Sequence, residues 1–203
     1  SLNLRYNQIR AEGAAAIAEA LRGNEVLTSL DVGGNSLTEE AALSIVRVER
    51  QRNKVTSLGL GRCSIGPTGA AEIAEYVSGS GVLNNIDLRG NSLGMEGWCA
   101  IFAALRDNKE NKIESWELSG QGINAEIAKV LAEYVSVSGV LTTLDLSSNN
   151  IGGETGLIKA SEVEGESKEV GAKVIYQGRE MVVSVGVDSD GELKLVDVVQ
   201  TGV

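Results

Sequence analysis

One short pattern returns along most of this chain at a nearly fixed interval. Residues 141–152 read LTTLDLSSNNIG, and the same frame recurs, with some replacements, at 113–124, 83–94, 55–66, 27–38 and 2–9. The steps between successive copies are 28, 28, 28, 30 and 28 residues, counted on the second apolar position, which is Leu2, Leu30, Leu58, Ile86, Trp116 and Leu144. A fixed period of this size predicts a solenoid in which each copy forms one structural unit.

Each copy predicts a strand, a turn and a helix. Apolar and polar residues alternate in 141–147, which is typical of a strand with one buried face. Alanine-rich stretches such as 11–24 and 68–81 follow the turns and favour helices. Because a helix is wider than the spacing of about 4.8 Å between strands, the stack should curve. We expect a parallel sheet on the concave face and helices on the convex face.

One position in every turn carries a polar residue or cysteine. An amide has donors and an acceptor, so it can satisfy backbone groups that are stranded in a buried bend. Cysteine and glutamine replace the asparagine in the third and fifth copies, and both can still form some hydrogen bonds. We therefore predict a structural role in the turn for Asn7, Asn35, Cys63, Asn91, Gln121 and Asn149.

The motif L-x-x-L-x-L-x-x-N-x-[LI], followed by a helix, resembles leucine-rich repeats. The step of 28 residues and the alanine-rich helices are similar to the ribonuclease-inhibitor subtype, which also occurs in NOD-like receptors and in the activating protein for the Ran GTPase. The resemblance covers residues 1 to about 158. It implies a horseshoe whose concave face and loop edges bind proteins, and it does not identify the partner.

The predicted concave face is mainly acidic. The residue between the two inward positions of each strand is an acid in four of the six copies, and an arginine lies two positions further on in two copies. These residues are either an acidic stripe for a basic partner or a solvated row without one. Exposed aromatic side chains are scarce there, which favours a weak or shape-driven contact. The candidate partner-binding residues are Asn3, Arg5, Asp31, Asp87, Arg89, Glu117 and Asp145.

The tryptophans and cysteines have different predicted roles. Trp116 replaces a strand leucine and should pack in the core. Trp98 starts a helix, and we expect it to be partly exposed on the outer edge and to contact a partner. Cys63 and Cys99 should be buried, reduced thiols.

The composition narrows the function classes. A net charge of −10 argues against nucleic acid as a partner. The absence of histidine excludes Ser-His-Asp and Cys-His mechanisms within this chain, and most zinc sites. No glycine-rich phosphate loop and no long apolar run are present. We predict no catalytic residue, metal or cofactor, and a cytoplasmic protein, or an organellar one if a leader has been removed.

The repeat pattern decays after Gly152. We predict a solenoid of six strand-turn units over 1–158, a polar linker over 159–169 and a small antiparallel β-sheet module over 170–203. Its strands should lie in 172–178, 180–188 and 192–198, with turns at Gly178 and at Asp190-Gly191. A short helix is a further option for 153–163. The module is weakly similar to SH3- or Tudor-like barrels.

Two more hypotheses concern this C-terminal region. The β module can be an insertion between the sixth strand and a helix that begins near 198–203. The stretch 186–197 places Asp188 and Asp190 at positions 3 and 5 of an EF-hand loop and Asp197 at position 12. Gly186 stands where the first ligand is needed and the flanks predict strands, so we favour a hairpin turn over a calcium site.

Three function classes remain. We favour a non-catalytic protein-interaction scaffold, either part of a longer repeat protein or a subunit of an assembly. The chain opens inside a repeat with no preceding cap, so a partner is expected to cover the first strand or the β module. The alternative is a regulator of a small GTPase, which the resemblance to the Ran-activating branch implies. An enzyme would depend on Asp87 and Glu117, which neighbouring strands bring together by the repeat alone.

Overall fold

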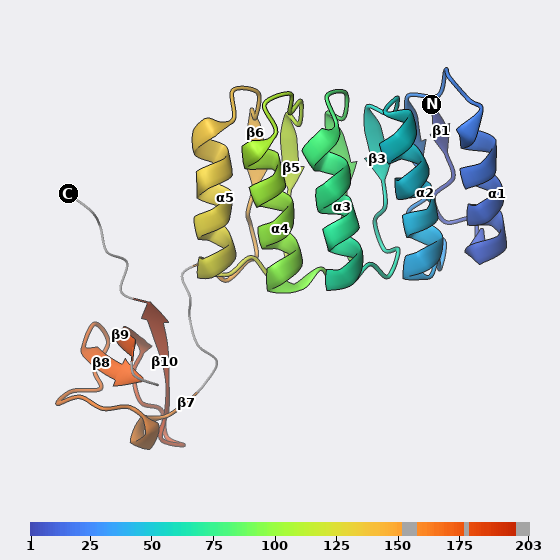
Figure 1. Cartoon of the computed structure of the whole chain (residues 1–203). Coiled ribbons are helices and arrows are strands. Elements are labelled where there is room, and N and C mark those ends of the chain that lie inside the picture. Colours follow the sequence, from blue (N-terminus) through green and yellow to red (C-terminus); the bar gives the residue numbers. More distant parts are fainter. Residues whose placement is uncertain (152–157, 177–178, 198–203) are drawn as a thin grey trace. The chain divides into compact units, whose positions relative to one another are not determined.

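The computed structural model describes residues 1–151, 158–176 and 179–197. The chain divides into two compact units, Ser1–Asn149 and Asn150–Val203. The first is an α/β solenoid and the second is a small antiparallel β-sheet, as predicted (Figure 1). Within the described ranges, no helix has the length and apolar character needed to cross a membrane.

The solenoid alternates short strands with helices. Figure 1 shows the helices side by side in one layer, with the strands in a second layer. The strands are β1 (Leu2–Asn3), β2 (Ser29–Asp31), β3 (Ser57–Gly59), β4 (Asn85–Asp87), β5 (Ser115–Glu117) and β6 (Thr143–Asp145). The helices are α1 (Arg10–Arg22), α2 (Glu39–Arg52), α3 (Pro67–Gly79), α4 (Gly94–Asp107) and α5 (Ala125–Val137).

The 28-residue period sets the register of the parallel strands. Leu30 in β2 lies opposite Leu2 in β1 and Leu58 in β3, and Leu58 lies opposite Ile86 in β4. Leu30 and Leu58 are fully buried. Equal spacing in the sequence therefore becomes a row of aliphatic contacts between the sheet and the helices.

The parallel ladder is interrupted between β4 and β5. Strands β1–β4 form one sheet, and β5 pairs with β6 in a second. The repeat that joins the two sheets is the one with a 30-residue step, from Ile86 to Trp116. Trp116 packs edge-on against two rings of α4; its ring centroid lies 6.2 Å from that of Trp98 and 5.8 Å from that of Phe102. We attribute the interruption to the two extra residues and to this bulkier aromatic layer.

Trp98 is buried, so the prediction that it contacts a partner on the outer edge is wrong. Its side chain is only 3 % exposed. The indole stacks on Phe102, which lies one turn further along α4, with 5.5 Å between the ring centroids. The start of a helix is often exposed, but at this junction Trp98 and Phe102 fill the space beside Trp116.

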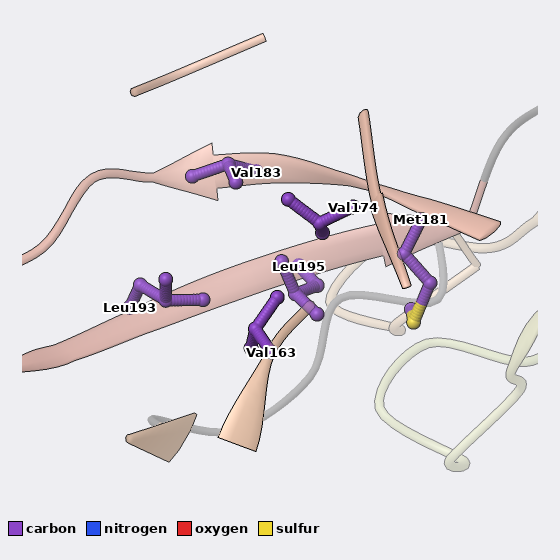
Figure 2. Close-up of a cluster of buried hydrophobic side chains, with 6 residues drawn as sticks. All are labelled: Val163, Val174, Met181, Val183, Leu193 and Leu195. Carbon is purple, nitrogen blue, oxygen red and sulfur yellow. The ribbon is translucent and has the colours of Figure 1, made fainter. Parts of the chain in front are cut away.

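The second unit is a four-stranded sheet that curls on itself. Its elements are β7 (Ile158–Lys159), a 3-10 turn (Ala160–Glu162), β8 (Lys173–Tyr176), β9 (Arg179–Val185) and β10 (Glu192–Asp197), in the antiparallel order β7-β10-β9-β8. A bridge between Glu164 and Ile175 brings the segment after β7 to the opposite edge of the sheet. Figure 2 shows the enclosed core, which contains Val163, Val174, Met181, Val183, Leu193 and Leu195.

The boundary between the units differs from the predicted one. Residues 159–169 were expected to be a linker, but Lys159 belongs to β7 and Val163 is buried in the β-sheet core. A two-residue strand is too short to show an alternating pattern, so β7 could not be predicted from the sequence. The expected helix over 153–163 is not found in its described part, which forms β7 and the 3-10 turn. Residues 153–157, the turn at Gly178 and the helix proposed near 198–203 lie outside the described residues.

One carboxylate shapes the connection between β9 and β10. Asp188 Oδ1 accepts hydrogen bonds of 2.9 Å from the backbone N–H groups of Asp190 and Glu192. Gly191 has a φ of 77°, which favours glycine. The side chain considered for calcium is therefore engaged by the turn. The described part of the chain holds no group of three His, Cys, Asp or Glu side chains that could bind a metal ion.

Candidate functional site

The candidate site is the surface of the parallel strands that faces away from the buried leucines, here called the sheet face. Successive side chains of a strand point to opposite sides, so burial of the leucines exposes the residues between them. A hollow of about 370 Å³ lies over β1 to β5. Six of the seven candidate partner-binding residues line it, namely Asn3, Arg5, Asp31, Asp87, Arg89 and Glu117, together with Ser29, Ser57, Asn85 and Ser115.

Arg5 crosses the sheet face from the first repeat to the fourth. Its Nη1 lies 3.1 Å from Asp31 Oδ2 and 3.0 Å from Asp87 Oδ2. The third repeat, which lies between these two acids, has Gly59 at the equivalent position. A Cβ at Gly59 would lie 2.3 Å from Asp31 Cγ. The missing side chain therefore leaves room for Asp31 and for the ion pairs of Arg5.

Arg89 connects the two parallel sheets through side chains. Its Nε lies 2.9 Å from Asp87 Oδ1, and its Nη1 pairs with Glu117 Oε2. Asp87 is in β4 and Glu117 is in β5, so this ion-pair bridge spans the junction at which the backbone ladder is interrupted. Arg5 and Arg89 together link four of the six repeats on the sheet face.

The arginines control the charge of Asp87. Burial of this carboxyl group opposes ionisation, but hydrogen bonds from the side chain and backbone of Arg89 and from Arg5 outweigh it and lower its pKa to about 2. The hydrogen bond to Asp87, followed by the contacts with Tyr6 and Asp31, raises the pKa of Arg5. Asp87 and Arg5 are therefore charged at neutral pH.

Asp145 and Asn3 complete the predicted row. Asp145 does not line the hollow, and it has no ion-pair partner among the described residues. The backbone N–H of Ser147 donates to its carboxylate and lowers its pKa. Asn3 accepts a hydrogen bond of 3.0 Å from the backbone N–H of Arg5. The sheet face thus ends in a carboxylate that a partner can reach.

The arrangement is better suited to binding than to proton transfer. Arg89 lies between Asp87 and Glu117, the two carboxylates considered for acid-base chemistry. A general acid at neutral pH needs a raised pKa, whereas the pKa of Asp87 is lowered.

The turn asparagines form hydrogen bonds between adjacent repeats. The Asn35 amide donates to the carbonyl oxygens of Leu4 and Val32, and its Oδ1 accepts from the backbone N–H groups of Asn7 and Ile9. Asn91 and Asn149 make corresponding bonds one repeat back, to residues 60–65 and 118–123. Asn7, in the first repeat, donates only within its own turn.

The two exceptions to asparagine form fewer bonds. The Cys63 thiol is buried, with Sγ 3.6 Å from the Gly61 carbonyl oxygen, and burial raises its pKa to about 12. The Gln121 amide donates to the Ser119 carbonyl oxygen. Cys99 is half-buried on α4, and burial raises the pKa of its thiol as well.

The sequence analysis missed the small polar residues of the hollow. Ser29, Ser57, Asn85 and Ser115 each start a strand, two positions before the acid or glycine of the same strand. The period of two would have placed them on the sheet face. The pairing of Arg5 with Asp87, 82 residues away, has no signal in the local pattern.

Comparisons with known proteins agree with this architecture. A family model described as "Leucine Rich repeat" matches residues 1–18, 23–46 and 140–156. The matched stretches are leucine-rich repeats at both ends of the solenoid. Solved structures are also similar in fold, two of which are described next, and a search of the curated proteins finds no match.

The first of these structures is entitled "Leiomodin-1 Actin-Binding Site 2". Its sequence is 17 % identical to this chain and the TM-score is 0.53. The match covers 66 % of this chain and 80 % of that one. The second is the C-terminal domain of tropomodulin from Caenorhabditis elegans, which is 10 % identical with a TM-score of 0.50, over 66 % of this chain and 83 % of that one. At these identities the likeness shows the fold alone.

Proposed function

We propose that this leucine-rich repeat protein is a non-catalytic protein-interaction scaffold and that the sheet face is its docking surface. The observation that carries the proposal is the ion-paired row over the hollow, in which Arg5 and Arg89 hold Asp31, Asp87 and Glu117 in place. Side chains that are already fixed lose less conformational entropy when a partner binds. The small side chains between them leave space for the partner's own groups.

The charge of the sheet face favours a polar or basic partner. Its four carboxylates, Asp31, Asp87, Glu117 and Asp145, outnumber its two arginines and leave a net charge of −2. Complementary charge speeds association and excludes wrong partners more than it adds affinity. Arg5 and Arg89 already neutralise part of the row, so we expect a partner to approach Asp145 and the exposed side of Glu117.

Crosslinking in a gentle extract of the protein's own source tests the proposal. The bait is the full chain, and crosslinked peptides are mapped by mass spectrometry. The variant Asn85→Arg places a long charged side chain over the hollow, and Ala71→Arg places the same side chain on an exposed position of α3. The expected result is one protein crosslinked around the sheet face by the wild type and by Ala71→Arg, and its loss from Asn85→Arg.

Two outcomes would contradict the proposal. One is a wild-type chain without crosslinks to another protein. The other is a partner that Asn85→Arg retains as strongly as Ala71→Arg does, because that partner would bind away from the sheet face. Near-ultraviolet circular dichroism of both variants checks that the packing of Trp98, Phe102 and Trp116, and with it the solenoid, is intact.

Two partner classes deserve direct assays. Actin is a reasonable first protein to test because one structure with this fold is an actin-binding site. GTPase regulation remains the alternative implied by the resemblance, and a panel of GTP-loaded GTPases without any rise in phosphate release would remove it. No described residue on the sheet face specifically favours either one.

Other sequence-based predictions remain proposals. They are the ribonuclease-inhibitor subtype of the repeats, an SH3- or Tudor-like relationship of the β unit, a partner that covers β1 or the β unit, and a cytoplasmic location. The bridge between Glu164 and Ile175 supports the SH3- or Tudor-like relationship, because it brings the segment after β7 against β8 at the opposite edge and so curls the sheet towards a barrel.

A further inference from the structure

A second hollow lies away from the sheet face, where β1, β2 and β3 pass into the turns before the helices. Its volume is about 760 Å³. Its wall includes Tyr6, Gly34, Ser36, Glu39, Arg62 and Ser64, which come from the first three repeats. No residue of this set lines the hollow of the sheet face. The two surfaces are therefore separate.

Arg62 is an uncompensated cation at this hollow. Its side chain is exposed and has no hydrogen-bond or ion-pair partner within the described part of the chain. Its stem lies over the next repeat, because a Cβ at Gly90 would be only 2.8 Å from Arg62 Cγ. Glycine at that position lets the arginine lie against the backbone. The guanidinium group is thus available to a ligand in a protein whose net charge is −10.

Tyr6 forms an aromatic wall of the same hollow. Its side chain is 62 % exposed, the largest exposed aromatic surface in the described solenoid. The ring lies over Gly34, since a Cβ there would be 2.5 Å from Cδ1 and Cε1 of Tyr6. The Arg5 guanidinium lies 5.5 Å from the ring centroid. The Gly34 backbone and the Arg5 guanidinium both contact the ring and restrict its orientation, while most of its surface stays exposed. Tyrosine and arginine are the residue types that dominate binding energy at interfaces.

The single acid in the wall does not neutralise Arg62. Glu39 Oε1 accepts hydrogen bonds of 2.8 and 2.9 Å from the backbone N–H groups of Gly66 and Gly69 at the start of α3. The positive end of that helix dipole compensates its charge. The remaining wall residues are uncharged, so Arg62 is the cation of this hollow and Glu39 is occupied by the start of α3.

We propose that this hollow binds an acidic peptide segment of a partner protein, with one carboxylate on Arg62 and the adjoining peptide against the Tyr6 ring. The geometry favours a carboxylate-bearing peptide over nucleic acid, because polyphosphate binding needs many cations and this surface supplies one. The proposal concerns a surface beyond the sheet face and does not depend on what binds there.

Titration of the full chain with short peptides tests the proposal. The probe is acetyl-Glu-Glu-Glu-amide, and the readout is the ¹⁵N–¹H correlation spectrum of the labelled protein. The expected result is a saturable shift of the amides of Tyr6, Gly34, Ser36, Arg62 and Ser64, weakened by added salt. Acetyl-Gln-Gln-Gln-amide and inorganic phosphate at the same concentration should leave these amides unshifted.

Matched variants separate a local contact from a general effect of charge. Arg62→Glu and Arg22→Glu change the net charge equally, and both positions are exposed. Arg62→Glu should weaken binding about fivefold or more, the size of an exposed ion pair, whereas Arg22→Glu should leave it unchanged. Three results would overturn the proposal. The first is an equal loss of binding in both variants. The second is an equal shift with the glutamine peptide or with phosphate, and the third is the absence of any saturable shift.

Discussion

The solenoid and the β unit assemble their hydrophobic cores differently. In the solenoid, the contacts of one repeat recur 28 residues later, as Leu30 opposite Leu58 and Leu58 opposite Ile86 show. In the β unit, the core joins residues without any period, such as Val163 from the segment after β7 and Leu195 from β10. Because of this repetition, the strand register of the solenoid can be predicted from the sequence, and each repeat is stabilised mainly by its neighbouring repeats. The β unit instead depends on one set of contacts that does not recur.

The largest expected effect tests the amide bonds between repeats. Asn35→Ala removes a fully buried side chain and leaves backbone groups of Leu4, Val32, Asn7 and Ile9 without their partner. We expect a loss of about 4 kcal/mol in the free energy of unfolding. Urea unfolding monitored by tryptophan fluorescence measures it, because both tryptophans lie in the solenoid.

The control for this change is Asn7→Ala. Asn7 is exposed, and its amide donates only to Leu4 and Arg5 within its own turn. A loss of about 1 kcal/mol is expected there. Similar losses at Asn35 and Asn7 would mean that the bonds between repeats add nothing to those within a turn.

The next effect tests whether the two units unfold separately. Leu193→Ala opens a cavity in the core of the β unit, where Leu193 is fully buried, and should destabilise that unit by about 3 kcal/mol. Amide hydrogen exchange should rise in β8, β9 and β10. The tryptophan transition of the solenoid should not move. A matching shift of that transition would show that the two units unfold as one.

A smaller effect concerns the acid stability of the sheet face. The pKa of Asp87 is lowered from 3.8 to about 2, so the unfolded chain takes up this proton first as pH falls. The stabilisation from Asp87, about 2 kcal/mol, is thus present above pH 4 and lost as pH falls through about 2. Asp87→Asn should be less stable than the wild type at pH 7, and the two curves should converge near pH 2. Parallel stability curves down to pH 2 would contradict the ion-pair network.

The smallest pair of effects compares one glycine from each unit. Gly59 is needed for space, because a Cβ would meet the Asp31 carboxylate. Gly191 is needed for its backbone, with a φ of 77° and open space around it. Alanine should cost about 1 kcal/mol at either site. Asparagine, which tolerates positive φ, should be accepted at Gly191 and harmful at Gly59; thermal unfolding of each unit measures this. Equal tolerance at the two sites would contradict these different roles.

The repeat made most of the solenoid predictable from sequence. The position of each leucine fixed the strand register, and the alternation within strands placed Asp31, Asp87 and Glu117 on one face. These features depend on local spacing, which a sequence displays directly. The two-residue lengthening between Ile86 and Trp116 was visible too, although its structural result, the interrupted ladder, was not.

Other features depended on contacts that local patterns do not encode. The burial of Trp98 follows from its packing against Phe102 and Trp116 across the junction. The reach of Arg5 to Asp87 depends on three-dimensional stacking and on the missing side chain of Gly59. The assignment of 159–169 to a linker failed because composition alone does not reveal a two-residue strand that pairs with distant β10.

The most direct test of a scaffold that docks its partner on the sheet face is the native mass of the labelled 203-residue chain after it is added to a gentle extract of its source. The account predicts a mass well above the 21.3 kDa of the chain for the wild type, and 21.3 kDa for Asn85→Arg. A wild-type mass of 21.3 kDa, or an equally large complex with Asn85→Arg, would contradict it.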